Sequence, residues 1–330
     1  MPIYNSNGSN NVKQDKVLTN LSLAYPNNEF VGNRLFPVVT VRKQTDKYYW
    51  FGREGWVPED SDYRAPGTEA NEIPGLQVAL DTYYASEHAL QIAVYDEERE
   101  NVDSPMSPDA DATNLVTQKI LLGRELAMMN FVTDATKYAS TNTVTLSGTA
   151  QWNDYTNSDP IGVIRTAMRA FHANVFFEPN TAVIPYQVMS VLEDHPKIMD
   201  RIKYTDRAIL TPEIIASVLG LKNVIIPEVA SGSGVGFSMT ASYLWGKNVL
   251  LAYVPSSPGL RVPAFAYEFV WAYPGAGAMK TDRWREEKRG SDLIRVRRRY
   301  DLKMVGVETN PASGNYGKSI TGYLIKNAIA

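Results

Sequence analysis

The feature that most limits the possible folds is a long, uninterrupted helical pattern in the first half of the chain. Residues 109–138 contain no proline and a single glycine, Gly123. Their apolar positions recur at mostly helical spacing, and they are Leu115, Ile120, Leu122, Leu126, Met129 and Val132. A helix of this length spans about 40 Å, which is more than a small domain needs for itself. We therefore predict a spine helix.

Two segments with strand-like composition precede this pattern and enclose a long polar loop. Residues 39–52 and 76–95 are rich in β-branched, aromatic and other apolar side chains, which favours strands. The loop between them carries three prolines and six acidic residues: Pro58, Pro66, Pro74, Glu54, Glu59, Asp60, Asp62, Glu69 and Glu72. Loops of this length in a compact domain are usually functional. We predict a protruding β-hairpin with exposed aromatic side chains that need a partner, namely Tyr48, Tyr49, Trp50 and Trp56.

The rest of the chain mixes helix and strand signals. Residues 1–16 are polar and rich in asparagine, which favours a flexible arm. Helices are expected at 160–173, where Asp159 and Pro160 give a start signal, and then at 187–195, 196–204 and 211–219. Strands are expected at 221–226, 242–255, 264–273, 283–306 and 319–330, with a turn-rich, β-prone segment at 141–158 and a glycine-rich surface loop at 231–238. Without tandem repeats, this order predicts an α+β fold.

The most charged segment, residues 283–306, alternates between charged and apolar positions. From Leu293 onward, one side carries Arg295, Arg297, Arg299, Asp301 and Lys303, and the other carries Ile294, Val296, Tyr300, Leu302 and Met304, with Arg298 as the exception. This period of two predicts a half-buried strand with a charged outer face. The favoured interpretation is a solvated or salt-bridged sheet face, because nearby acids supply opposite charge: Asp282, Glu286, Glu287 and Asp292.

Two other uses of this charged strand stay open. One is contact with the acidic loops of neighbouring copies, since arginine pairs well with carboxylates. The other is nucleic-acid binding, which is less favoured because the chain has a net charge of -3 and lacks interleaved stacking aromatics. The candidate residues for contacts between copies are Tyr49, Trp50, Trp56, Glu59, Asp60, Arg283, Arg285, Arg295, Arg297 and Arg299.

Composition and motifs argue against an enzyme or a metalloprotein. The chain has no cysteine, and its three histidines, His88, His172 and His195, are widely spaced. Residues 314–319, GNYGKS, have Ala312 where a phosphate-binding loop needs glycine. The segment 232–236 lacks the GxGxxG spacing, and no GxSxG motif occurs. We expect no catalytic residues, no cofactor and no metal.

Membrane association is not expected either. The N-terminus does not combine a basic start with an apolar run, as a signal peptide does. No window of the sequence approaches the roughly 20 apolar residues of a membrane span.

The order of these parts resembles the major capsid proteins of tailed bacteriophages, which have the Hong Kong 97-type fold. The textual resemblance lies in two segments, ASVLGLKNVIIPEV (216–229) and SYLWGKNVLLAYVP (242–255). In the family, a helix and strand of the axial domain precede a variable loop, a Trp-Gly pair and an apolar strand. The matching residues here are Trp245, Gly246, Leu250, Leu251, Tyr253 and Val254.

This resemblance implies an N-terminal arm at 1–38, an extended β-hairpin loop at 39–95 and a peripheral domain with the spine helix at 96–158. An α/β axial domain at 159–265 and a β-rich return to the peripheral domain at 266–330 would follow. It also implies a structural protein whose copies form hexamers and pentamers of an icosahedral shell around double-stranded DNA. Such a shell is expected to assemble in the host cytoplasm.

By the same resemblance, the partners are other copies of the chain, a portal protein, in some members a decoration protein, and packaged DNA contacted without sequence specificity. Because Met1 and Pro2 precede only a short polar arm, a separate scaffolding protein is expected. Some relatives join subunits through lysine–asparagine bonds; the candidates here are Lys43, Lys47, Asn310 and Asn315, and we do not expect the bond. The alternative with the same fold is an encapsulin-like compartment that encloses an enzyme.

Overall fold

The computed structural model describes residues 13–14, 30–51, 63–70, 72, 78–102, 107–202, 212–233, 240–259, 262 and 264–330. The helical elements in these ranges are α2 (Gly32–Leu35), α3 (Asp96–Glu100), α4 (Pro108–Thr133), η2 (Ala135–Lys137), η3 (Ser140–Asn142), η4 (Gly148–Ala150), α5 (Pro160–Val175), α6 (Tyr186–Glu193), α7 (Pro196–Ile202), α8 (Pro212–Leu219) and η5 (Glu287–Arg289). The strands are β1 (Lys13–Gln14), β2 (Val38–Val41), β3 (Thr45–Phe51), β4 (Val78–Tyr84), β5 (Ser86–Tyr95), β6 (Thr143–Thr145), β7 (Thr181–Val183), β8 (Asn223–Ile225), β9 (Ala230–Ser233), β10 (Thr240–Tyr243), β11 (Val249–Ala252), β12 (Ala266–Trp271), β13 (Met279–Glu286), β14 (Ser291–Met304) and β15 (Gly322–Lys326).

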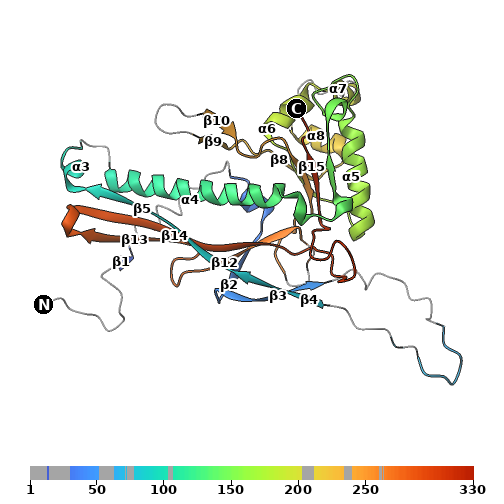
Figure 1. Cartoon of the computed structure of the whole chain (residues 1–330), viewed down its shortest axis with the longest axis horizontal. Coiled ribbons are helices and arrows are strands. Elements are labelled where there is room, and N and C mark those ends of the chain that lie inside the picture. The colour runs from blue at the N-terminus through green and yellow to red at the C-terminus, as the bar shows by residue number, and fades with distance from the viewer. Residues whose placement is uncertain are drawn as a thin grey trace.

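The first structural unit is a long sheet with a helix laid along one face (Figure 1). Its central strand, β14, pairs antiparallel with β13, β5 and β12. The outer strands are β1, which pairs with β13, and β2, which pairs in parallel with β12. The even-numbered residues of β14 face α4, where Ile294 meets Ala112, and Val296 meets Val116 and Ile120. The predicted alternation of this strand is confirmed, and its apolar side is the one that the helix covers.

The spine helix is confirmed, but its buried face differs from the expected one. α4 ends at Thr133, five residues before the expected end, where Asp134 caps the short η2 turn by accepting a hydrogen bond from the Thr136 N–H. Leu115 and Leu126 are 48% and 42% exposed. The buried residues of α4 include polar ones, namely Thr113, Thr117, Arg124 and Glu125. Apolar spacing alone therefore misplaced part of the contact face.

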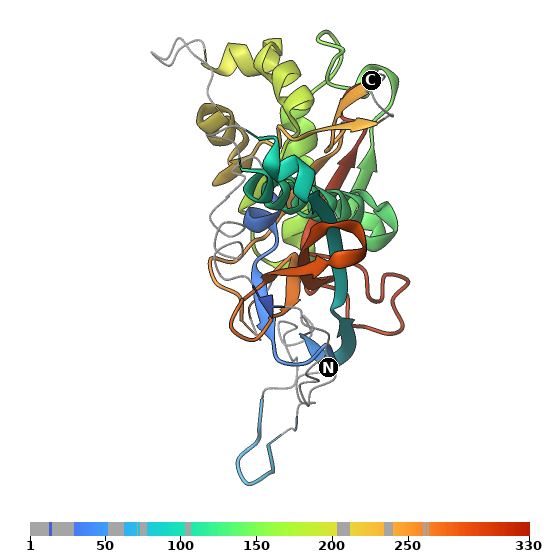
Figure 2. The ribbon, with the colours of Figure 1, turned by 90° about the vertical axis from the view of Figure 1, so that its left-hand side faces the viewer.

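The second unit stands upright at one end of the first (Figures 1 and 2). Its sheet has the order β6-β15-β11-β7-β8, and α5 to α8 lie in the same unit. Its core is built around large, fully buried side chains, among them Trp152, Phe171, Leu192, Ile215 and Leu251. Two parts of the chain differ here from the expected division. β6 and β15, which were expected in the peripheral domain, pair with each other and with β11 in this sheet.

The glycine-rich segment at 231–238 also differs from expectation. Its first residues belong to β9, which pairs antiparallel with β10 in a separate two-stranded hairpin. The remaining residues, 234–238, lie outside the described ranges. A surface loop was expected because glycines usually mark turns, but backbone pairing across the hairpin includes Gly232, which is opposite Ala241.

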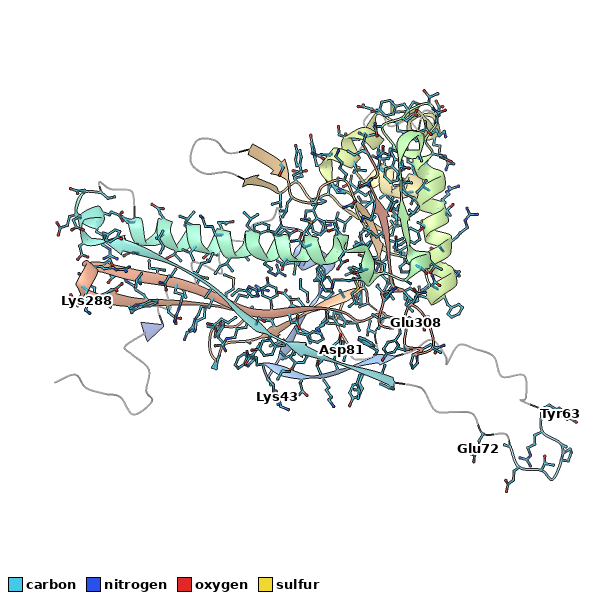
Figure 3. The ribbon with its side chains drawn as sticks, viewed as in Figure 1. Lys43, Tyr63, Glu72, Asp81, Lys288 and Glu308 are labelled. Carbon is cyan, nitrogen blue, oxygen red and sulfur yellow. The ribbon has the colours of Figure 1, made fainter. Side chains whose placement is uncertain are left out.

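The expected hairpin at 39–95 is divided between two sheets. The first predicted strand is broken into β2 and β3, and the second into β4 and β5. The outer halves, β2 and β5, each join the long sheet, whereas β3 and β4 pair with each other as a two-stranded hairpin. The break lies at Gln44 and Ala85, where the Ala85 N–H donates to the Gln44 carbonyl at 2.8 Å. The described tip, residues 63–70 and 72, is exposed and extends away from the body, as the labelled Tyr63 and Glu72 show (Figure 3).

Candidate functional site

Three buried charges form a triad between the spine helix and the long sheet. Glu268 on β12 is fully buried, and Arg124 of α4 donates to its two carboxylate oxygens at 2.9 and 2.5 Å. Arg298 of β14 donates to the same carboxylate at 3.2 and 2.9 Å. The exception in the alternation of β14 is thus explained, because Arg298 faces the helix and finds an acid there.

The electrostatics of this triad favour its fully charged form. Burial alone would raise the pKa of Glu268, but Arg298 and Arg124 hold the pKa below its usual value. The triad joins three elements, α4, β12 and β14, and fixes how the helix sits on the sheet. Glu268 and Arg124 were not among the candidates from the sequence. The residue in the sequence that could have pointed to a buried acid was Arg298, since a charge on an apolar strand face requires a buried partner.

A second buried carboxylate, Glu125, joins the spine helix to α2 and to the turn that follows β10. It accepts hydrogen bonds from the Trp245 Nε1–H at 2.9 Å, from the Gly32 N–H at 3.1 Å and from the Val31 N–H at 3.3 Å. Burial raises the pKa of Glu125, although these three donors oppose the shift. Trp245 and Gly246 are the Trp-Gly pair noted in the sequence. Gly246 has a positive φ of 59°, which favours glycine at this turn.

The outer face of the long sheet carries the predicted arginine row. Arg295 and Arg297 contact the carboxylate of Asp282 at 3.2 and 2.5 Å, and Arg299 contacts Glu87 at 2.7 Å. Burial alone would raise the pKa of Glu87, but Arg299 and Arg297 hold it below its usual value. Pairing within the sheet, the favoured interpretation, is therefore confirmed for these arginines.

Aromatic rings lie beneath the same arginines. The Arg299 guanidinium carbon is 4.1 Å from the ring centre of Trp271 and 4.2 Å from that of Tyr273. Arg295 lies over Trp284 at 4.9 Å. Burial, together with the adjacent Glu87, raises the pKa of Tyr273 to about 12. Stacking on rings orients the guanidinium planes, which leaves them less rotational freedom than on an open strand.

Arg283 and Arg285 lie apart from this row, on the helix side of the sheet near its far end. The register places Arg283 opposite Ile294, and its guanidinium contacts Asp292 at 2.5 Å and Asp109 at 3.3 Å. Arg285 pairs with Asp96 at 2.5 Å, and Arg99 joins the same cluster. Asp109 lies in the first turn of α4, as expected for a helix-start charge.

Of the aromatic residues expected on the hairpin surface, two are buried within the chain. Tyr48 and Trp50 are 7% and 9% exposed, because they share the hairpin face that packs on Phe269 and Tyr316. Tyr49, on the opposite face, is 50% exposed. The expectation of exposed aromatics is therefore wrong for Tyr48 and Trp50 and right for Tyr49. Trp56, Glu59 and Asp60 lie outside the described residues.

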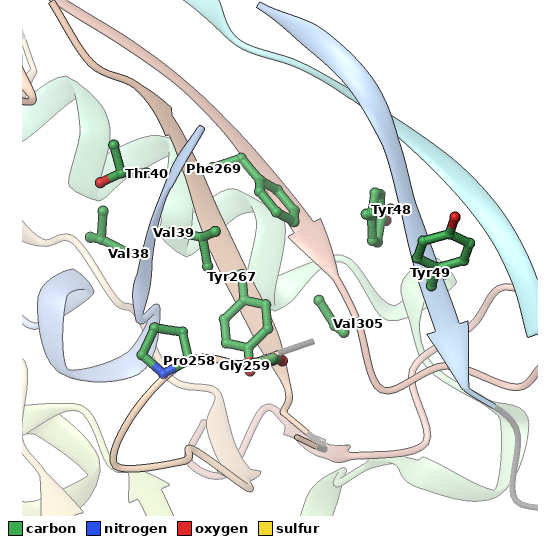
Figure 4. A pocket seen from close by; sticks show the side chains of 10 residues that line it. All are labelled: Val38, Val39, Thr40, Tyr48, Tyr49, Pro258, Gly259, Tyr267, Phe269 and Val305. Atoms are coloured by element: carbon green, nitrogen blue, oxygen red, sulfur yellow. Dashed lines mark hydrogen bonds between the residues drawn. The ribbon is translucent and has the colours of Figure 1, made fainter. Parts of the chain in front are cut away.

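A groove with a volume of about 290 Å³ opens where the hairpin meets the long sheet (Figure 4). It is lined mainly by apolar and aromatic residues: Val38, Val39, Thr40, Tyr48, Tyr49, Pro258, Gly259, Tyr267, Phe269 and Val305. The Tyr48 hydroxyl donates to Asp81 at 2.7 Å, and burial raises its pKa. The groove contains no charged side chain in its lining, so it has no evident chemistry of its own.

A buried serine–histidine pair lies in the second unit, and its geometry argues against catalysis. His195 Nε2 is 3.0 Å from Ser158 Oγ, and both residues are fully buried. The other ring nitrogen, Nδ1, accepts a hydrogen bond from the Lys197 N–H at 3.2 Å. Because Nδ1 is an acceptor, the neutral ring carries its proton on Nε2 and donates to the serine. It therefore cannot remove the serine proton, and His195 acts as the N-cap of α7.

This cap predicts a specific loss of stability in acid. Burial lowers the pKa of His195; Lys197 acts in the same direction and Asp159 opposes it. The unfolded chain, with a histidine pKa of about 6.5, then binds the proton more readily, so stability falls as the pH drops below about 6.5. We expect His195→Asn, which keeps a capping acceptor without titrating, to lose less stability between about pH 7.5 and pH 5 than the wild type.

Urea unfolding of the unassembled chain at the two pH values measures this difference. Burial also lowers the pKa of His88, which lies on β5 and stacks on Tyr300 at 4.5 Å. His88 is present in both proteins, so only the difference between their pH profiles reports on His195. Identical profiles would show that the cap does not titrate in this range.

The described residues contain nothing that resembles a metal centre or a membrane span. No cluster of three or more histidine, aspartate or glutamate side chains there is arranged to hold a metal ion. Among the helices of the described ranges, none combines the length and the apolar composition that crossing a bilayer requires.

Comparisons with known proteins show which other proteins share this architecture. No protein-family profile matches the chain. The major capsid protein of Burkholderia phage BcepMu is 30% identical over 249 residues, which cover 74% of this chain and 78% of that protein. The major capsid protein of Pseudomonas phage JBD67 is 29% identical over 218 residues, covering 65% of this chain and 68% of that protein.

Solved structures agree on the fold. A phage-related protein from Bordetella bronchiseptica superposes with a TM-score of 0.73 at 22% identity, covering 96% of this chain and 98% of that one. A subunit of the mature capsid of bacteriophage PhiM1 superposes with a TM-score of 0.53 at 11% identity, covering 98% and 92%. The Hong Kong 97-type α+β fold expected from the sequence is confirmed. The chain belongs to the major capsid proteins of bacteriophages.

Proposed function

We propose that this chain is the repeating subunit of an icosahedral shell, built from hexamers and pentamers, that encloses the double-stranded DNA genome of a tailed phage. The observation that carries the proposal is the identity of 30% with a phage major capsid protein across most of both chains. The chain acts as structure, without catalysis, since the serine–histidine pair of the second unit is a helix cap.

The shape of the subunit supports a role in which neighbours complete it. The described loop tip is exposed along its whole length, and Tyr63 is 82% exposed. The outer face of the hairpin carries Tyr49, Leu80 and Tyr84, each at least half exposed. Exposed apolar side chains gathered on one projecting element mark contact surfaces more often than free surfaces. Two buried carboxylates, by contrast, hold the elements of the body together, so the subunit is a rigid body from which the loop projects.

Assembly also involves other proteins in this proposal. A separate scaffolding protein guides shell closure in the host cytoplasm, a portal protein occupies one vertex, and a decoration protein binds the outside of the finished virion. The net charge of -3 is consistent with a wall that contacts packaged DNA weakly and without sequence preference.

Expression of the chain with and without the scaffolding protein tests the proposal. We expect closed shells, tubes or capsomer rings in negative-stain electron microscopy, with a matching particle mass from light scattering. A monodisperse monomer under both conditions would contradict the proposed function. Nucleic acid protected from nuclease inside particles purified from infected cells supports a genome container, whereas an enclosed enzyme supports the encapsulin-like alternative.

A further inference from the structure

The buried carboxylate of Glu125 serves two parts of the chain that are far apart in the sequence. On one side it accepts hydrogen bonds from the backbone N–H groups of Val31 and Gly32 at 3.3 and 3.1 Å, at the start of α2. On the other side it accepts the Trp245 Nε1–H at 2.9 Å, just after β10. Because all three donors share one carboxylate in a water-poor site, the strength of each bond depends on the others.

Residues 30–36, which contain α2, lie between the spine helix and the second unit. Four of their side chains are buried in the same core cluster as Met128 of α4 and Trp245, and they are Phe30, Val31, Leu35 and Phe36. The ring centre of Phe36 is 6.0 Å from that of Phe131 on α4. Residues 30–36 are therefore a wedge that separates the spine helix from the second unit.

The wedge comes closest to the spine helix at Gly32. A β-carbon at this position would overlap the sulfur of Met128 and would lie 2.9 Å from a carboxylate oxygen of Glu125. Only a glycine therefore lets the backbone reach the carboxylate. The nearest atoms belong to Met128 and Glu125, so an added methyl group at position 32 disturbs the wedge side of the site first.

The forces that hold the wedge in place are nearly balanced. Burial of four apolar side chains favours the seated position, but seven residues must be ordered, and these two opposing contributions are of similar size. Among the described residues, the hydrogen bonds that join the wedge to other elements both end at Glu125. Hydrogen bonds to a charged acceptor are stronger than ordinary ones, so these two determine whether the wedge stays seated.

The other donor, Trp245, lies at the base of the β9–β10 hairpin, which projects from the second unit (Figure 1). The base is closed by the Leu244 N–H, which donates to the Val229 carbonyl at 2.9 Å, and Trp245 follows directly. The indole is 2% exposed, in the core cluster that it shares with the wedge. Its bond to Glu125 therefore acts at the point where the hairpin leaves the body.

We propose that the wedge and the base of the β9–β10 hairpin are released together, because both are held by Glu125. When the wedge leaves, the carboxylate loses two of its three donors and water enters the site, so the bond to Trp245 weakens as well. Any displacement of the wedge from its N-terminal side then changes the mobility of the hairpin. This coupling belongs to the single subunit and goes beyond its role in a shell.

Hydrogen exchange of the unassembled wild-type chain, followed by mass spectrometry in increasing sub-denaturing urea, tests the joint release. The reporters are the Phe36 amide, which donates to the Gly32 carbonyl at 2.8 Å, and the Leu244 amide. We expect both to exchange through one opening with the same urea dependence, and their protection to be about tenfold or more below that of β11. Different urea dependences, or exchange only together with β11, would contradict the proposal.

Two substitutions on opposite sides of Glu125 test the direction of the coupling. Gly32→Ala is expected to speed exchange about tenfold at Leu244 as well as at Phe36, as the loss of one charge-assisted hydrogen bond allows. Trp245→Phe is expected to speed exchange about tenfold at Phe36 as well as at Leu244, because coupling between two sites is reciprocal. An effect confined to the near reporter in both variants would show that the two contacts are independent.

Matched controls exclude a general effect of each kind of substitution. Gly123 is exposed on α4 with no atom within 4 Å of an added β-carbon, so Gly123→Ala is expected to leave both reporters unchanged. Trp152 is fully buried in the second unit, and its Nε1 has no partner in the described part of the chain. Trp152→Phe is therefore expected to leave exchange at Phe36 unchanged.

The outcomes separate this inference from the proposed function. If Gly32→Ala lowers the protection of β11 as much as that of the reporters, the variant has unfolded the chain, and the wild-type urea series decides alone. Normal particles from a chain whose two reporters open separately overturn the inference and leave the shell function intact. Joint opening in a chain that never assembles supports the inference and contradicts the shell.

Discussion

Replacing Glu268 by glutamine is expected to destabilise the subunit by about 3–5 kcal/mol. The amide keeps the volume of the side chain but removes the charge that two buried guanidiniums, Arg124 and Arg298, share. Both cations then remain in a water-poor layer between α4 and the sheet. Urea unfolding of the unassembled chain measures the loss, and a change below about 1 kcal/mol would mean that the triad is hydrated.

Two matched variants separate the loss of pairing from the loss of a carboxylate. Glu287→Gln removes an exposed acid whose side chain is 84% exposed beside Arg285, and its effect is expected to stay within about 0.5 kcal/mol. The triple variant Arg124→Met, Glu268→Leu, Arg298→Met removes all three charges and is expected to recover most of the stability that Glu268→Gln loses. Recovery would show that the cost comes from unpaired buried charge.

The triad also shows which features can be predicted from the sequence and which cannot. The alternation of β14 and the uninterrupted pattern of α4 are local, so both elements follow from spacing alone. The partner of Arg298 is Glu268, which lies 30 positions earlier, and Arg124 lies 144 positions before Glu268. A count of apolar residues along α4 favours Leu115 and Leu126, because it cannot register that Arg124 becomes buried once β12 supplies its acid, Glu268.

Long-range pairing explains the other differences. β15 is the last strand of the chain, yet it lies between β11 and β6 in the second unit, and nothing in its own composition distinguishes the two sheets. The break at Gln44 and Ala85 likewise depends on long-range pairing, because the two halves of each expected strand pair in different sheets. The arginine row was found from the sequence because its alternation is local, whereas its pairing with Glu87 required the register of β5 on β14.

Replacing Trp245 is the second change for which we expect a large effect, because this side chain joins the second unit to the spine helix. Trp245 is 2% exposed, and its Nε1–H donates to Glu125 of α4. Trp245→Ala is expected to cost about 3–5 kcal/mol, from the cavity and the lost hydrogen bond together. Trp245→Phe keeps most of the ring and is expected to cost about 1–3 kcal/mol, mainly the bond to the carboxylate.

The pH dependence of the Trp245→Phe deficit distinguishes hydrogen bonding from packing. Burial already raises the pKa of Glu125, and loss of the indole donor raises it further, since that donor stabilises the ionised form. A carboxyl whose folded pKa lies above its unfolded value near 4.3 binds the proton more tightly when folded, so stability falls as the pH rises through that interval. The deficit of Trp245→Phe should therefore be larger at about pH 8 than at about pH 4.5 when unfolding is measured at both. A deficit independent of pH would assign the effect to packing of the ring, and Glu125 would then be held by the backbone N–H groups of Val31 and Gly32 alone.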